Sequence, residues 1–290
     1  MSDSQEPIEN LKKVALNKAA SKFRDFVVEK ITGKSMQVHE AEGKVEADKI
    51  LTRWNEIEKP LWLKMETAKM QRQYSNFENT LRKTIPHITA TENKISDDND
   101  TFAGLLEHSK EISNEEMQDL IAKIIAGEYN APGAYSMHTL QIVKTLDARV
   151  LKTLEKVGGL VINKNQIPVT LFESNEPAQE FLSKLGIRFE DIMLLLSLGL
   201  LLSSESVARH KIQHKTVVPL EYFGKWILYF STITEAGKIE EVQTVIHYGL
   251  TQAGEQILQH LNPQYSKDYF AWLQDHYKIP YCEVYKPDPA

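Results

Sequence analysis

The sequence predicts a mainly α-helical protein with a C-terminal α+β part, in which an N-terminal helical region is followed by a winged-helix-like domain. Apolar residues recur at helical spacing through most of residues 8–157. Runs of β type first occur after Val157, and they alternate with helical segments. The resulting order of helix, strand, helix, helix, strand, strand, helix is expected of a winged-helix-like α+β domain. We therefore divide the chain into residues 1–100, 101–157, 158–262 and 263–290.

The composition is that of a globular protein of 290 residues, 42% of them hydrophobic, which is enough for one large or two modest cores. The formal net charge of −6 disfavours a dedicated nucleic-acid binder, because phosphate attraction dominates such binding. The single cysteine, Cys282, excludes an intrachain disulfide and a cysteine-based zinc site. The N-terminus lacks a signal-peptide core, and the longest apolar run, 192–202, is too short to span a bilayer. We therefore expect a cytoplasmic protein.

The first 100 residues are predicted to form long amphipathic helices. Residues 8–31 have apolar positions at helical spacing and a lysine-rich opposite face. Such a helix either packs on its own domain, which we favour, or lies on an anionic membrane surface. Residues 39–83 form a second helical stretch, in which Pro60 produces a kink or begins a new helix.

An apolar seam follows Pro60 at heptad-like spacing. It consists of Leu63, Met70, Tyr74, Phe77 and Leu81. A helix this polar elsewhere needs its apolar seam covered. The cover is either the 8–31 helix of the same chain or the same seam of a second chain, and we favour a homodimer slightly over a monomer.

Residues 101–157 carry three successive helix-start signals. Ser113 and Glu116 have capping-box spacing, and Ser136 and Asp147 are candidate N-caps. Gly127 is a candidate stop for the first of these helices. The apolar stripes of this bundle should be buried; they comprise Leu120, Ile121, Ile124, Ile125, Leu140, Val143, Leu151 and Leu154.

The C-terminal half contains the predicted α+β elements. A strand is expected at 167–172, followed by helices that end near Gly186 and Gly199 and by a helix that begins near Thr251. Residues 263–290 contain an aromatic amphipathic helix and an extended end. The aromatic residues of this segment indicate an interface, although core packing is the commoner reason for such residues. They are Tyr265, Tyr269, Phe270, Trp272 and Tyr277.

The region from residue 101 to residue 261 resembles the core of the prokaryotic abortive-infection alpha proteins and of a wider group of uncharacterised bacterial proteins. The resemblance is carried by Ser113, Glu115, Ala122, Ile124, Ile125, Gly127, Glu128, Pro132, Gly133, Ser136, Thr139, Leu140, Leu146, Asp147 and Ala148, and by the later segments LLLSLGLL and LTQAGEQIL. It implies a bacterial protein with a role in phage defence. It supplies no catalytic residues that can be transferred to this chain.

Catalytic and ligand-binding motifs give weak signals. The sequence has no glycine-rich phosphate loop and no H-E-x-x-H, so we predict no cofactor and no metal. His210 and His214 have metal-ligand spacing without a third ligand nearby. Arg82 and His87 have the R-x4-H spacing of a helical RNase class, in which arginine holds phosphate and histidine transfers protons. Pro86 lies inside that motif and would disturb its helix.

Nucleic-acid recognition by the winged-helix-like domain would require polar side chains on its recognition helix. The candidate helix offers Arg188, but also Glu190 and Asp191, and its remaining residues are those of a buried helix. Arg209, Lys211 and Lys215 in the expected wing could contact phosphates. Our leading hypothesis is therefore a non-enzymatic protein that acts through an unknown protein partner, in phage defence. The alternative is DNA binding by the wing or RNA cleavage by Arg82 and His87.

Overall fold

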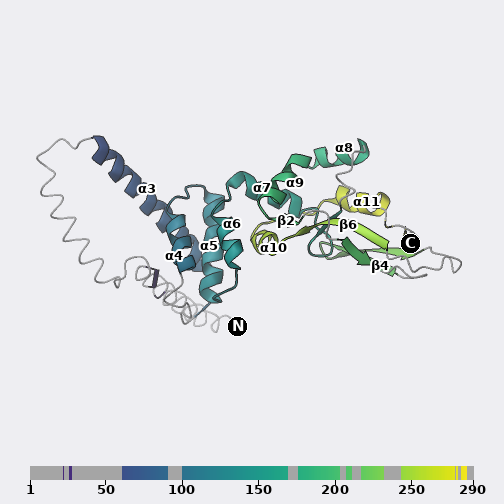
Figure 1. Cartoon of the computed structure of the whole chain (residues 1–290), viewed down its shortest axis with the longest axis horizontal. Coiled ribbons are helices and arrows are strands. Elements are labelled where there is room, and N and C mark those ends of the chain that lie inside the picture. Colours follow the sequence, from purple (N-terminus) through teal and green to yellow (C-terminus); the bar gives the residue numbers. More distant parts are fainter. Residues whose placement is uncertain are drawn as a thin grey trace, which may run out of the picture. The chain divides into compact units, whose positions relative to one another are not determined.

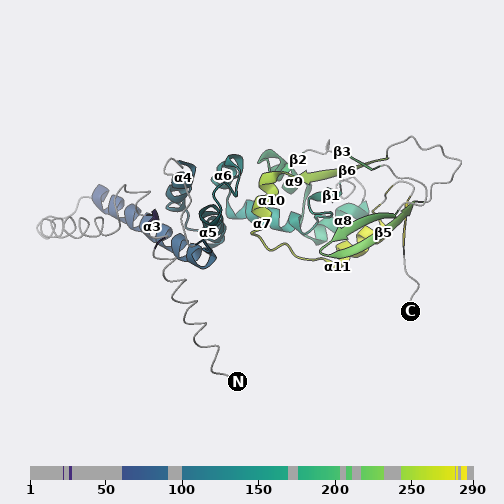
Figure 2. The ribbon, with the colours of Figure 1, turned by 90° about the horizontal axis from the view of Figure 1, so that it is seen from below.

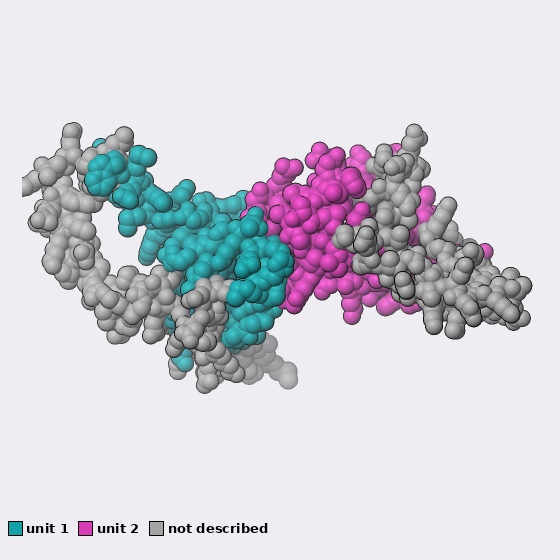
Figure 3. All heavy atoms as spheres, viewed as in Figure 1, with its two compact units in different colours: residues 1–145 teal, residues 146–290 magenta. Residues whose placement is uncertain are grey.

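A computed structural model of the chain describes residues 22, 26–27, 61–90, 100–168, 176–202, 207–210, 217–231, 243–277, 279 and 282–285. The chain consists of two compact units, residues 1–145 and 146–290, which are coloured separately in Figure 3. Most of the predicted helices at 8–31 and 39–59, and residues 169–172 of the predicted strand, lie outside the described residues.

The predicted fold class is confirmed, because the first unit is helical and the second combines helices with small antiparallel sheets (Figures 1 and 2). The described elements of the first unit are α3 (Leu61–Thr84), η1 (Ile85–His87), α4 (Asp100–Ser109), α5 (Glu115–Asn130) and α6 (Met137–Val143). Those of the second unit are α7 (Ala148–Gly158), β1 (Gln166–Pro168), α8 (Glu176–Lys184), α9 (Phe189–Ser197), β2 (Leu201–Leu202), β3 (Val207–His210), β4 (Val217–Tyr222), β5 (Lys225–Ser231), β6 (Gln243–Leu250), α10 (Gln252–Leu258), α11 (Lys267–Asp275) and β7 (Cys282–Val284). Among the described helices, none has the length and the apolar character needed to cross a membrane.

The core of the first unit is built around α5, which packs against both α3 and α4. Phe26, in a short described piece of the N-terminal region, places its ring 5.7 Å from the rings of Phe102 and Tyr129. Val27 beside it is fully buried. These two residues therefore pack on their own unit, as we favoured for the helix at 8–31.

The predicted burial of the apolar stripes is confirmed. Each of the eight residues is 5% exposed or less: Leu120, Ile121, Ile124, Ile125, Leu140, Val143, Leu151 and Leu154. The first six line the interior of the first unit, whereas the last two lie on α7, in the second unit.

Two of the three predicted helix starts are confirmed by their hydrogen bonds. The Ser136 side chain accepts a hydrogen bond from the Thr139 amide at 3.1 Å, and the Asp147 carboxylate accepts one from the Val150 amide at 2.8 Å. Each bond satisfies an amide that lacks a partner within its own helix. The polar residues of this region therefore act at helix starts.

The predicted start of α5 is wrong by one residue. Asn114, rather than Ser113, caps the helix by accepting a hydrogen bond from the Met117 amide at 3.0 Å. The Ser113 hydroxyl instead accepts one from the Asn76 side chain at 3.1 Å. A contact with α3 thus takes the serine away from the helix end, and its neighbour supplies the cap.

The predicted stop at Gly127 is also wrong, because α5 continues to Asn130. A Cβ atom at Gly127 would lie 2.6 Å from the Tyr135 hydroxyl, so the glycine makes room for that ring. The buried Glu128 carboxylate accepts hydrogen bonds from the amides of Gly133 and Tyr135 at 2.9 and 2.7 Å. These contacts fix the turn from α5 to α6.

The second unit has β6 at the centre of its larger sheet. β1 pairs with β6 on one side, and β2 and β3 pair with successive parts of β6, all antiparallel. The helix ends predicted at Gly186 and Gly199 are confirmed, since both glycines have positive φ angles just past α8 and α9. The predicted start of α10 is confirmed by Thr251, whose side chain accepts from the Gly254 amide at 3.0 Å.

A smaller sheet, β4–β5–β7, contributes to an aromatic core. The Tyr222 hydroxyl donates to the Gly159 carbonyl and accepts from the Ser266 amide, both at 2.9 Å. Burial raises the pKa of Tyr222 to about 12, so this hydroxyl stays protonated at neutral pH. Tyr269 on α11 is fully buried and donates to the Leu160 carbonyl at 2.9 Å. Core packing is therefore the role of Tyr269, and equally of the buried Trp272 and Tyr277.

Candidate functional site

The C-terminal half of α3 is anchored to the rest of the first unit. Glu111 accepts hydrogen bonds from Arg72 at 3.3 Å and from Gln73. Asn76 donates to the Lys110 carbonyl at 2.9 Å, and Lys83 forms an ion pair with Asp119 at 2.7 Å. The buried face of this half is polar, and it consists of Asn76, Thr80 and Thr84.

The first half of α3, together with Tyr74 just beyond it, presents large apolar side chains to solvent. Trp62, Met65, Met70 and Tyr74 are 62%, 65%, 65% and 70% exposed. A helix of 24 residues is about 36 Å long, whereas the 16 residues of α5 reach only about 24 Å. The end of α3 near Leu61 consequently lies beyond α4 and α5 (Figures 1 and 2).

The predicted seam divides between these two halves of α3. Met70 and Tyr74 are exposed, whereas Phe77 and Leu81 are half-buried. Leu63 lies on α3, but its side chain is outside the described residues. The seam is therefore partly covered toward Thr84, and further exposed apolar side chains, Trp62 and Met65, lie upstream of it on α3.

The candidate RNase pair lies at the end of α3. Arg82 forms an ion pair with Glu78, one turn earlier, at 2.8 Å. His87 follows in η1, and its carbonyl accepts a hydrogen bond from the Asn130 side chain at 2.8 Å. The helix changes to 3-10 geometry between Arg82 and His87, where Pro86 lies. The two residues therefore do not share one regular α-helical face, which is what that chemistry requires.

The candidate wing residues are only partly described. Arg209 lies on β3, where it is paired with Thr244 of β6. Lys211 and Lys215 lie outside the described residues, as does His214. In the described part of the chain, no group of three or more His, Cys, Asp or Glu side chains is arranged to hold a metal ion.

The expectation that α9 is a buried helix is wrong. Only Ile192 and Leu195 are buried, whereas Phe189 and Met193 are 50% and 48% exposed. These two side chains are four residues apart and share one face of the helix. The apolar composition of α9 reflects this exposed face as well as a buried one.

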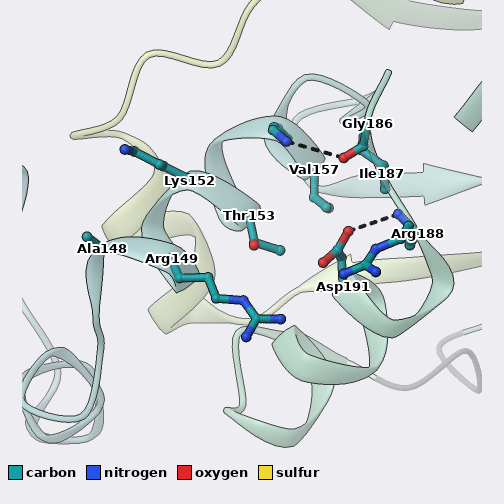
Figure 4. Close-up of a pocket in the computed structure, with 10 residues that line it drawn as sticks. Ala148, Arg149, Lys152, Thr153, Val157, Gly186, Ile187, Arg188 and Asp191 are labelled. Carbon is teal, nitrogen blue, oxygen red and sulfur yellow. Dashed lines mark hydrogen bonds between the residues drawn. The ribbon is translucent and has the colours of Figure 1, made fainter. Parts of the chain in front are cut away.

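A pocket of about 520 Å³ lies between α7 and the segment that leads into α9 (Figure 4). It is lined by Ala148, Arg149, Lys152, Thr153, Lys156, Val157, Gly186, Ile187, Arg188 and Asp191. Four of these residues are cationic and one is acidic. The Asp191 carboxylate accepts a hydrogen bond from the Arg188 amide at 2.9 Å, which satisfies the first turn of α9.

Sequence analysis named Arg188 only as a potential DNA contact and missed the other residues of this pocket. Arg149, Lys152 and Lys156 recur at spacings of three and four residues, which places them on one side of α7. That spacing could have indicated a basic face. Arg188 lies near this basic face because α7 packs against α9, and that packing cannot be read from the spacing.

A second feature of the first unit is the histidine of α4. The Nε2 atom of His108 is buried and has no hydrogen-bond partner among the described residues. Burial lowers the pKa of His108 from its usual 6.5, the nearby Lys144 ammonium lowers it further, and Glu111 opposes this shift. The neutral imidazole is therefore the form that suits the folded unit.

We predict that the first unit loses stability as the pH falls below about 6.5. The unfolded chain then binds a proton that folded His108 resists, so protonation favours unfolding. The pH range of the loss extends from the unfolded pKa down to the lowered folded pKa, with a slope of at most about 1.4 kcal/mol per pH unit. Urea unfolding of His108→Gln across this range should show a smaller slope than wild type. The exposed His138→Gln is the control, and equal slopes for His108→Gln and wild type would contradict the prediction.

These features define a two-unit protein with an exposed apolar helix end and a separate basic pocket. The chain belongs to a family of proteins of unknown function, DUF2806, which it matches over residues 63–274. The matched region runs from α3 to α11 and includes parts of both units. No curated protein and no solved structure matches the chain.

Proposed function

We propose that the protein acts through protein–protein contacts in the bacterial cytoplasm, and that its first partner is a second copy of the same chain bound along α3. The observation that carries this proposal is the exposed apolar end of α3, where Trp62, Met65, Met70 and Tyr74 are each more than 60% exposed and where Met70 and Tyr74, four residues apart, share one face of the helix. Exposed large apolar side chains on one helix face are typical of interaction sites. Aromatic residues and methionine are also enriched at interfaces.

A second copy fits this surface better than an unrelated protein, because the apolar residues continue as a seam with heptad-like spacing. Two such seams pack by knobs-into-holes contacts when two helices lie alongside each other. A symmetric pair would bury each residue of the seam twice, so one substitution changes both halves of the interface.

The second unit supports the same class of function. We assign it as a winged-helix-like domain, because α7, β1, α8, α9, β2 and β6 follow the order of that fold, and β6 lies between β1 and β2. Its α9 would occupy the place of a recognition helix. Phe189 and Met193 on its exposed face suit an apolar protein surface better than the edges of bases.

The test of assembly is light scattering on the full-length protein at tens of micromolar. Wild type is expected to be a dimer, and Met70→Glu/Tyr74→Glu a monomer, because four carboxylates would enter one apolar interface. The control is Gln71→Glu/Ser75→Glu, which adds the same charge at exposed positions that lie about 100° around the helix from Met70 and Tyr74. This control should remain dimeric. A monomeric wild type would mean that the seam is covered within one chain.

The role in phage defence rests on the resemblance to the abortive-infection alpha proteins. Deletion of the gene is expected to raise plaque counts in a phage-challenged host, and wild type should restore protection. Met70→Glu/Tyr74→Glu should fail to restore it, whereas Gln71→Glu/Ser75→Glu should succeed. Unchanged plaque counts over a broad phage panel would contradict the defence role without affecting the proposed dimer.

A further inference from the structure

The pocket between α7 and α9 concentrates positive charge in a unit that is acidic as a whole. Residues 146–290 contain 14 Lys and Arg against 17 Asp and Glu. Four of those cations line this one pocket, together with a single carboxylate, Asp191. The local charge therefore has the opposite sign to that of the unit, and it would attract an anion small enough to be held by the pocket alone.

The two arginines have the geometry to hold such an anion. Figure 4 shows Arg149 and Thr153 pointing from α7 toward the side of the pocket that Arg188 and Asp191 form, whereas Lys152 points away. Neither guanidinium is within ion-pair distance of a carboxylate among the described residues. Guanidinium groups match the oxygens of a phosphate group in pairs, which a lysine ammonium does not.

The remaining lining residues hold the pocket in place. Lys156 donates a hydrogen bond to the Gly186 carbonyl at 3.3 Å, and this bond ties α7 to the turn before α9. The buried Val157 and Ile187 form its floor. The Asp191 carboxylate accepts a hydrogen bond from the Arg188 amide at 2.9 Å, so one oxygen of this single acidic lining residue has a structural role.

We propose that this pocket binds the phosphate group of a small ligand, such as a phosphate monoester or a nucleotide. Its volume of about 520 Å³ lies within the usual range of small-molecule sites, about 300–1,000 Å³. The ten lining residues include no aromatic ring on which a base could stack. Phosphate, rather than base, is therefore the group that is recognised. A long nucleic acid is disfavoured because the rest of the unit repels it.

Binding is tested on the full-length protein by nuclear magnetic resonance titration at fixed ionic strength. The probes are inorganic phosphate, adenosine 5′-monophosphate and adenosine. The two phosphates are expected to shift the resonances of α7 and of the turn before α9, whereas adenosine should not. Arg149→Gln/Arg188→Gln should weaken binding of the monophosphate by at least about tenfold, because two charged hydrogen-bonding groups are lost.

The control variant is Lys164→Gln/Lys267→Gln, which removes the same charge from exposed positions outside the pocket. If this control weakens binding of the monophosphate as much as Arg149→Gln/Arg188→Gln does, the loss reflects only the net charge of the protein, and the proposal is overturned. The absence of phosphate binding at millimolar concentration, or equal binding of adenosine, would also overturn it. If the double variant is misfolded, the single variants Arg149→Gln and Arg188→Gln provide the same comparison.

Titration with a labelled DNA duplex tests whether the pocket binds the phosphates of a nucleic-acid backbone instead of those of a small ligand. The duplex is expected to bind more weakly than the monophosphate at physiological salt. Tight duplex binding that is lost in Arg149→Gln/Arg188→Gln, without binding of the small phosphates, would show that the pocket holds a nucleic-acid backbone. That outcome would overturn the small-ligand proposal and would leave the proposed dimer untouched.

Discussion

Replacing Leu120 or Ile124 by alanine is expected to destabilise the first unit by about 2–5 kcal/mol. The two side chains are 2% and 0% exposed, and they lie on one face of α5, the helix against which both α3 and α4 pack. Removing three carbon atoms from such a position loses apolar burial and leaves a cavity that the surrounding helices fill only in part. The cost is a large fraction of the 5–15 kcal/mol that stabilises a typical domain.

The measurement is urea unfolding followed by circular dichroism, with hydrogen exchange of the α5 amides to assign the transition to the first unit. Two compact units need not unfold together, so a single transition cannot be assumed. The control is Asp119→Ala, next to Leu120, whose half-exposed carboxylate forms an ion pair with Lys83. It should cost less than about 1 kcal/mol. A cost that small at both Leu120 and Ile124 would mean that the stripe contacts solvent or a partner.

Three helix starts were predictable from local sequence. Ser136, Asp147 and Thr251 each accept a hydrogen bond from an amide three residues further on, which is a local geometry that the sequence encodes. Ser113 failed because Asn76, 37 residues earlier, donates to its hydroxyl. Gly127 failed for a similar reason, since the Tyr135 ring requires the space beside it. Neither contact follows from local pattern.

The candidate sites were likewise only partly predictable, because they depend on contacts between residues far apart in the sequence. Helical spacing predicts that Met70 and Tyr74 share a face of α3, but whether this face is covered depends on the reach of α5. The three cations of α7 form a pattern in the sequence, but Arg188 joins them only through the packed structure. For Arg82 and His87, the spacing suggested a catalytic pair, but Pro86 argued against a regular helix there, and Pro86 does lie with His87 in the 3-10 turn that follows α3.

Several of the residues on which the resemblance to the abortive-infection alpha proteins rests have structural roles in this chain. Glu128 and Ser136 fix the turn from α5 to α6 and the start of α6, and Asp147 starts α7. The later segment LTQAGEQIL supplies Thr251, the cap of α10, and Gly254. A resemblance that rests on such residues indicates a similar fold. The function has to be inferred from the surfaces that the fold presents.

Gly254→Ala is expected to destabilise the second unit by about 1–3 kcal/mol, although alanine is the better helix former. A Cβ atom at this position would lie 2.1 Å from the Leu200 carbonyl oxygen. That oxygen also accepts a hydrogen bond from the Thr251 amide at 3.1 Å, so α10 is held against the end of α9 by its own first residues. The obstacle is backbone, which cannot rotate aside as a side chain can.

The sign of the change in unfolding free energy tests whether α10 lies this close to the Leu200 carbonyl. If the space beside Gly254 were open, alanine would stabilise α10 by about 1 kcal/mol through helix propensity. Urea unfolding followed by tryptophan fluorescence gives the free energy, and the second unit contributes the buried Trp272 of α11 to that signal. Gln252→Ala, at an exposed position of the same helix, should stay within about 0.5 kcal/mol of wild type. A more stable Gly254→Ala would show that α10 does not press against Leu200, and that the glycine serves another purpose.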